Sequence, residues 1–144
     1  MFSSAGFAKT WQYIQLFKEG LICTLSLSAL TVLFGFILAL ALALMRMSKI
    51  KPLSWFATAY VELFRATPML VQLFIIYYVV FAKANLPNFK LFGFIRFERF
   101  FPGVVALSMN SGAYLSEIIR AGIQSIDHGQ TEAARSLGPL QGRL

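Results

Sequence analysis

The sequence predicts an all-α integral membrane protein, and three features of the chain support this prediction. Of its 144 residues, 58% are hydrophobic and only 13% are charged, whereas soluble domains carry about 25% charged residues. The mean hydropathy is +0.68, and residues 21–45 contain no charged side chain. The length accommodates three or four spans with their loops in one domain over residues 1–144, but no large soluble domain.

The net charge of +7 raises the question of a nucleic-acid partner. The chain has no basic run with interleaved aromatic residues, and membrane proteins collect Lys and Arg at the ends of their spans. We therefore expect no nucleic-acid partner. The single cysteine, Cys23, lies in an apolar run without neighbouring metal ligands. It is interpreted as a small buried hydrophobic side chain, and we expect neither a metal nor another cofactor.

The first predicted span covers residues 21–45. At about 1.5 Å per residue this run crosses a bilayer with some tilt. Residues 1–19 form a weakly amphipathic lead without the features of a signal peptide. Small residues that allow close helix packing in lipid lie along the span; they are Thr24, Ser26, Ser28, Thr31 and Gly35.

The second predicted segment covers residues 55–81, and we expect it to be broken. Thr67 followed by Pro68 is typical of a helix start, with Thr67 at the N-cap and Pro68 at the first helical position. Residues 68–81 alone are shorter than the roughly 20 needed to span. We expect residues 53–66 near the inner interface and residues 68–81 across most of the membrane.

Two charged residues in this segment, Glu62 and Arg65, are three positions apart and are predicted to pair on one helix face. Such a pair is either a structural feature of the interface or part of a functional path. Residues 82–100, with Asn85 and Pro87 as helix breakers, are predicted to form a loop.

The third predicted span covers residues 101–123. Asn110 lies near its middle, and an Asn in lipid must find hydrogen-bond partners, so it should face the bundle interior. It is either a packing contact between helices or a group that lines a path. Glu117 and Arg120 form a second predicted pair near the membrane exit.

Loop charge does not decide the topology. With the N-terminus outside, six basic residues lie in inner regions and six in outer ones. The inner ones are Arg46, Lys49, Lys51, Arg120, Arg135 and Arg143, and the outer ones are Lys9, Lys18, Lys83, Lys90, Arg96 and Arg99.

Residues 129–138 read GQTEAARSLG and are predicted to form a short helix. Asp127 is placed to cap its start and Gly138 to end it. Ala133 and Ala134 provide a face of small residues that lets another surface approach closely. The segment is either a docking element or an ordinary helix of a cytoplasmic loop.

Three stretches occur in this order along the chain: YVELFRATPMLVQLF at 60–74, LSMNSGAYLSEIIRAGIQSI at 107–126 and GQTEAARSLG at 129–138. Together they resemble the membrane subunit of bacterial ABC importers, in the subfamily of polar amino-acid permeases for histidine, glutamine and arginine. The resemblance covers residues 20–138. It implies a type I permease-like helical bundle in the bacterial inner membrane, with an outside N-terminus and usually five spans, three of which this chain would contain.

The resemblance also implies partners. A second permease subunit, identical or not, two ATPase subunits and an extracytoplasmic amino-acid-binding protein would complete the transporter. Coupling to the ATPase falls on Gly129, Glu132, Ala133, Ala134 and Gly138.

The same resemblance places the substrate pathway at Asn110 and, secondarily, at Gln72. The implied function is ATP-driven import of polar amino acids.

The chain departs from the pattern at its end, where Pro139 follows Gly138 directly and Leu144 is the last residue. Two further spans would be expected there, so the expectation is a truncated permease. The alternative is a non-transporting membrane protein that only binds the ATPase or the permease partner.

No catalytic site is expected. The chain lacks the GxxxxGK[ST] loop that binds nucleotide phosphates, so ATP would be hydrolysed by a separate chain. A membrane enzyme that uses Glu62, Glu117 or Asp127 as acid or base is the competing hypothesis. It has little support because the sequence contains no HExxH, CxxC or Ser–His arrangement.

Overall fold

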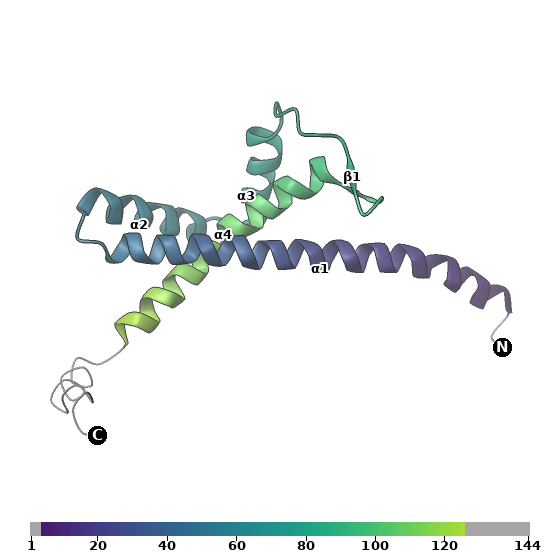
Figure 1. Cartoon of the computed structure of the whole chain (residues 1–144), viewed down its shortest axis with the longest axis horizontal. Helices are drawn as coiled ribbons and strands as arrows, with labels where there is room; N and C mark the ends of the chain where they lie inside the picture. The colour runs from purple at the N-terminus through teal and green to yellow at the C-terminus, as the bar shows by residue number, and fades with distance from the viewer. Residues whose placement is uncertain (1–3, 126–144) are drawn as a thin grey trace, which may run out of the picture.

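The computed structural model describes residues 4–125, and their side chains from residue 13 onward. The elements are helices α1 (Ser4–Met47), α2 (Lys51–Ala66) and α3 (Met69–Ile75), the π-helical turn η1 (Ile76–Val80), strands β1 (Lys90–Leu91) and β2 (Ile95–Arg96), and helix α4 (Phe97–Gln124). Helix α2 lies beside the C-terminal part of α1, and α4 crosses α1 in the C-terminal half of α1 (Figure 1). The predicted coupling segment, residues 129–138, lies outside the described residues.

Helix α1 contains the first predicted span and is longer than expected. The stretch Tyr13–Met47 is the one helix among the described residues that is by itself long and apolar enough to cross a membrane. The lead over residues 1–19 is therefore not a separate element, because the helix is continuous from Ser4. The buried positions Thr31, Gly35 and Ala39 repeat every four residues, which defines a single packing face.

The predicted break in the second segment is confirmed. Thr67 is extended (φ −111°, ψ 143°), as a residue before proline prefers. The chain bends by 110° between α2 and α3–η1, and the two together form either one broken span or a re-entrant loop. The expected register is wrong by one residue, because Pro68 is the extended N-cap and Met69 is the first helical residue.

The region predicted as a loop, residues 82–100, contains regular structure at its end. Strands β1 and β2 form an antiparallel hairpin in which Lys90 pairs with Arg96 and Leu91 with Ile95. Gly93 in the turn has φ +82°, a conformation that glycine adopts without strain. Helix α4 then begins at Phe97, earlier than the predicted start of the third span at residue 101.

Helices α1 and α4 form the most extensively packed pair of elements. At Gly35 an added Cβ would lie 3.1 Å from the Cβ of Ser111, and at Gly112 it would lie 2.9 Å from Cδ2 of Leu38. Such distances show that the two helices touch through small residues, which is how helices associate in lipid.

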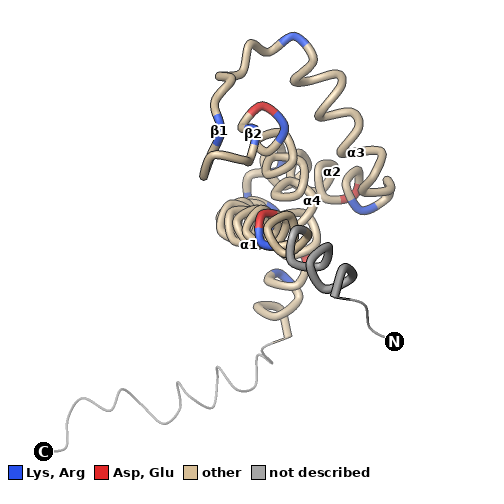
Figure 2. Tube along the Cα trace, turned by 90° about the vertical axis from the view of Figure 1, so that its right-hand side faces the viewer, with Lys and Arg blue, Asp and Glu red and all other residues tan. Residues whose placement is uncertain are grey.

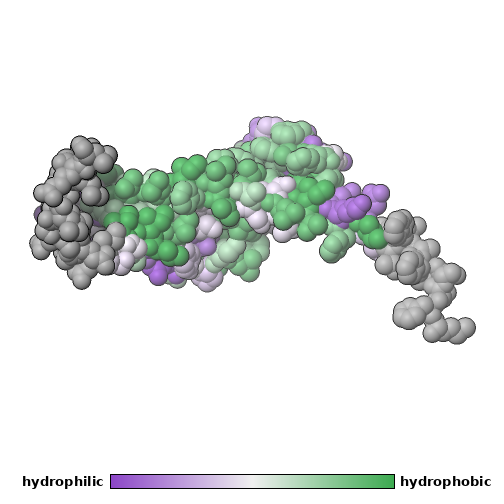
Figure 3. Space-filling view, turned by 60° about the horizontal axis from the view of Figure 1, so that its bottom comes forward, coloured by the Kyte–Doolittle hydropathy of each residue, from purple (hydrophilic) through white to green (hydrophobic). Residues whose placement is uncertain are grey.

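The core consists of two clusters along α1. The first joins α1 to α2 through Leu42, Ala57 and Val61. The second joins α1 to the hairpin and the start of α4, and half-buried Cys23 packs against it. Many large hydrophobic side chains are exposed along the helices, and the face shown in Figure 3 is largely apolar. Charged residues are sparse along the helices (Figure 2). An apolar exterior of this kind suits lipid or further helices.

Candidate functional site

The amide of Gln72 occupies the inside of the bend between α2 and α3. Its side chain is 7% exposed. The Nε2 atom donates hydrogen bonds to the backbone oxygens of Phe64 (2.7 Å) and Thr67 (3.0 Å), and to Oγ1 of Thr67 (2.7 Å). The last carbonyls of a helix have no donor within that helix, and Pro68 has no N–H to offer. Gln72 therefore supplies the missing donor at the end of α2.

Asn110 lies on α4 opposite this bend and is half-buried. Its Nδ2 atom donates to Oε1 of Gln72 at 2.8 Å. One residue earlier on α4, the backbone oxygen of Met109 accepts a hydrogen bond from the hydroxyl of Tyr60 on α2 at 3.0 Å. The structure thus brings together the two residues predicted for the substrate pathway, and it ties both halves of the broken segment to α4.

An apolar groove of about 170 Å³ lies beside the bend. Its lining residues are Leu63, Phe64, Thr67, Val71, Gln72, Ile75 and Ile76. Apolar walls with a few polar groups are typical of small-molecule sites, but those sites usually measure about 300–1,000 Å³. The groove is therefore too small to be a complete site of that kind.

A second polar group, which we call the arginine–glutamate cluster, consists of Arg46, Arg65, Glu117 and Arg120. The Glu117 carboxylate forms an ion pair with Arg46, which lies in the last turn of α1. It also accepts a hydrogen bond from Arg120 at 2.6 Å, and Nη1 of Arg65 lies 3.8 Å from its Oε2 atom. The cluster joins the C-terminal ends of α1 and α2 to α4.

The predicted pair of Glu117 and Arg120 is confirmed, whereas the predicted pair of Glu62 and Arg65 is wrong. Among residues 13–125, no ion pair joins these two side chains: Glu62 is exposed, and Arg65 turns toward Glu117 and stacks over the ring of Tyr114, 5.6 Å from its centroid. A guanidinium gains from both an aromatic face and a carboxylate, and both are offered by α4.

The convergence of Arg46 and Arg65 on Glu117 was missed from the sequence. Its signal was present only as three charges near the ends of three apolar segments. The acid–base hypothesis gains nothing from the geometry, because Glu117 is held by guanidinium groups and Glu62 faces outward. Asp127, its third residue, lies outside the described residues.

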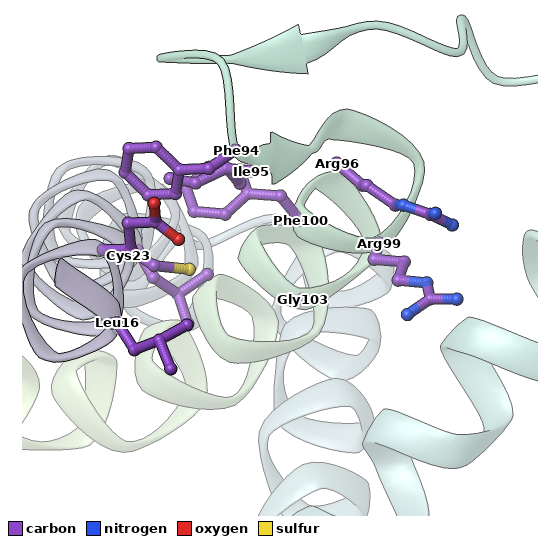
Figure 4. A pocket seen from close by; sticks show the side chains of 11 residues that line it. Leu16, Cys23, Phe94, Ile95, Arg96, Arg99, Phe100 and Gly103 are labelled. Carbon is purple, nitrogen blue, oxygen red and sulfur yellow. The ribbon is translucent and has the colours of Figure 1, made fainter. Parts of the chain in front are cut away.

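A larger groove, of about 520 Å³, lies between the N-terminal half of α1 and the start of α4. Leu16 and Cys23 of α1 face Phe94, Ile95 and Phe100 across it, while Arg96 and Arg99 extend side by side away from them (Figure 4). The groove is thus largely apolar, and its labelled polar groups do not converge on one point.

Comparison with known proteins identifies relatives over most of the chain. Residues 21–139 match the family described as "Binding-protein-dependent transport system inner membrane component". The chain is 43% identical over 138 residues to the arginine transport system permease protein ArtQ of Bacillus subtilis, covering 96% of this chain and 59% of that protein. It is 45% identical over 116 residues to the nopaline transport system permease protein NocM of Agrobacterium fabrum, covering 80% and 48%. The chain therefore spans about half of the length of such relatives.

A solved structure gives the same result for the fold. The crystal structure of an amino acid ABC transporter with histidines superposes with a TM-score of 0.74 at 45% sequence identity, covering 98% of this chain and 60% of that one. The predicted all-α, ABC permease-like fold is thereby confirmed. With the match over residues 21–139, the chain belongs to the family of inner-membrane components of binding-protein-dependent transport systems.

Proposed function

We propose that this chain is part of a membrane subunit of an ATP-driven importer that moves polar amino acids across the bacterial inner membrane. The observation that carries the proposal is the similarity to the amino acid ABC transporter, at 45% identity over 98% of the chain. Relatives named for arginine, cystine and nopaline transport support the substrate class. A second permease subunit, an ATPase dimer and an extracytoplasmic binding protein complete the transporter, and ATP is hydrolysed by the ATPase.

Within this proposal, α4 carries both the substrate contact and the link to the ATPase. Asn110 lies in its middle, Glu117 two turns later, and residues 129–138 follow its end. Gly129, Glu132, Ala133, Ala134 and Gly138 form the coupling surface that docks on the ATPase. A movement of the ATPase dimer on closure would then be transmitted to Asn110 along helix α4.

Reconstitution in lipid vesicles with a cognate ATPase and amino-acid receptor tests the transport function. Uptake of labelled arginine or glutamine that requires both ATP and the receptor would support it. ATP hydrolysis stimulated by this chain without any uptake would favour the alternative of a chain that only binds its partners. If the chain supports no uptake and stimulates no ATP hydrolysis, the transport function and the binding-only alternative are both contradicted.

Replacing Glu132 or Gly138 with alanine should uncouple ATP hydrolysis from uptake. For Glu132→Ala, the loss of one charged docking contact, at about 1.5–3 kcal/mol, corresponds to a fall in uptake per ATP of roughly tenfold or more. Gly138→Ala should act through the backbone, because alanine disfavours the left-handed conformation that ends the predicted helix. Uptake and hydrolysis are measured in the same vesicles, with Gln130→Ala as a neighbouring control. Normal uptake per ATP in both variants would contradict the docking role.

Labelling should place residue 131 on the cytoplasmic side and the β1–β2 hairpin outside. In a Cys23→Ala background, a membrane-impermeant maleimide is expected to label Thr131→Cys only after the cells are permeabilised. Asn88→Cys, next to the hairpin, is expected to react in intact cells. Labelling of Thr131→Cys in intact cells would put the coupling surface on the wrong side of the membrane.

A further inference from the structure

The orientation of the Gln72 amide is fixed by its surroundings. The backbone oxygens of Phe64 and Thr67 accept hydrogen bonds and cannot donate. The hydroxyl of Thr67 donates to the backbone oxygen of Leu63 at 2.9 Å, so toward Gln72 it also acts as an acceptor. Three acceptors thus surround one end of the amide, and only the NH₂ group can face them.

The orientation of Asn110 follows from that of Gln72. With its NH₂ group turned to the end of α2, Gln72 presents Oε1 to α4, and an oxygen requires a donor. Asn110 must therefore direct Nδ2 toward Gln72, as the 2.8 Å contact shows. The Oδ1 atom of Asn110 is then free to accept a hydrogen bond from another group. Among the described side chains and backbone it has no hydrogen-bond partner.

We propose that Gln72 is a positioning residue that holds the bend and, through Asn110, presents a hydrogen-bond acceptor to the transported molecule. The group that this acceptor recognises is an N–H donor, namely the ammonium group of an amino acid. The inference rests on the proposed transport function and assigns Gln72 a role different from a direct pathway contact. A released Asn110 would present its NH₂ group as readily as its oxygen.

Discrimination between an amino acid and its 2-oxo acid tests the acceptor. The 2-oxo acid replaces the ammonium group by an oxygen that only accepts, so an Asn110 held with Oδ1 forward should reject it. Vesicle uptake is measured for whichever of L-arginine and L-glutamine is transported, with the matching 2-oxo acid as competitor. In Gln72→Met the ratio of the two apparent affinities should fall about tenfold, since the released amide can donate to the oxo group.

Two further variants separate positioning from general damage. Asn110→Asp keeps acceptor oxygens and should leave the ratio at or above its wild-type value, even where the rate of uptake falls. Gln15→Met, the same substitution at an exposed site on α1, should change neither rate nor ratio. An unchanged ratio in Gln72→Met, with both affinities reduced equally, would overturn the positioning role.

The bend itself is tested without transport. Nitroxide labels at Leu63→Cys and Val79→Cys, both exposed and on opposite sides of the break, report the angle between α2 and η1 in a Cys23→Ala background. The distance distribution should broaden in Gln72→Met and in Gln72→Glu, because neither side chain offers an NH₂ group. A narrow, unchanged distribution would refute the role of Gln72 at the bend, whether or not the chain transports an amino acid. Absence of uptake in the wild type would instead count against the proposed function.

Discussion

Replacing Glu117 with glutamine should destabilise the helical bundle more than any other single change of charge in the described residues. The substitution keeps the size of the side chain and leaves Arg46, Arg65 and Arg120 facing one another without their carboxylate. Removing one partner of a buried ion pair costs about 3–5 kcal/mol. Because the side chains of the Glu117–Arg46 pair are 23% and 12% exposed, solvent should reduce this cost to roughly 2–3 kcal/mol.

The measurement is thermal unfolding of the purified protein in detergent or lipid nanodiscs, followed by circular dichroism. Glu62→Gln is the matched control, since Glu62 is exposed on α2 and forms no ion pair among residues 13–125. It should leave the midpoint unchanged, whereas Glu117→Gln lowers it by several degrees. Equal midpoints for the two variants would show that the cluster contributes nothing to stability.

A double-mutant cycle locates the interaction within the cluster. Arg46→Met and Glu117→Gln should each destabilise the protein, and together they should cost less than the sum of the two, because the second change removes a charge that the first left unpaired. Additive costs would mean that Glu117 acts through Arg65 or Arg120 instead. Since Arg46 lies in the last turn of α1 and Glu117 lies on α4, the coupling energy measures how strongly the cluster holds these helices together at one end.

The break at Thr67–Pro68 could be predicted from sequence because its causes are local. Proline restricts the residue before it and lacks an N–H group, and both effects act within two residues. The role of Gln72 could not be predicted, since a glutamine five residues after Thr67 reaches back to it only when the chain has already turned. Asn110 was identified as a polar residue in need of partners, but its partner depended on how α4 lies against the bend.

The two predicted ion pairs also show that local sequence rules fail where tertiary contacts decide the outcome. Glu117 and Arg120 were paired correctly because their spacing of three residues places them on neighbouring helix turns. The same rule failed for Glu62 and Arg65, where a carboxylate and an aromatic ring on α4 outweighed a weak exposed pair of about 0.3–0.5 kcal/mol. The spacing rule thus failed where another helix offered Arg65 better partners, and it held for Arg120, whose side-chain partners Glu117 and Gln124 lie on its own helix.

Substitutions of glycine on α4 should have opposite effects at two positions on the same helix. At Gly122 an added Cβ meets nothing within 4 Å, and alanine favours helix over glycine by about 0.5–1 kcal/mol, so Gly122→Ala should be neutral or slightly stabilising. At Gly112 the added Cβ would lie 2.9 Å, 3.0 Å and 3.2 Å from three carbons of Leu38 on α1. Overpacking of this kind costs about 1–3 kcal/mol, so Gly112→Ala should lower the thermal midpoint, and Gly112→Leu should prevent α1 and α4 from packing.

Removing the obstacle on α1 tests whether the close contact of the two helices is the cause. Leu38→Ala removes Cγ and Cδ2, the two carbons nearest to the new Cβ, and leaves only the Leu38 Cβ contact at 3.2 Å. The pair Leu38→Ala with Gly112→Ala should therefore be more stable than the sum of the single costs predicts. Gly112→Ala without any loss of stability would show that α1 and α4 have room to separate. Additive costs would instead place the damage within α4 itself, as expected for a helix whose neighbours do not constrain it. Because α4 carries both Asn110 and Glu117 on one continuous helix, the contact at Gly112 fixes where both side chains lie relative to α1.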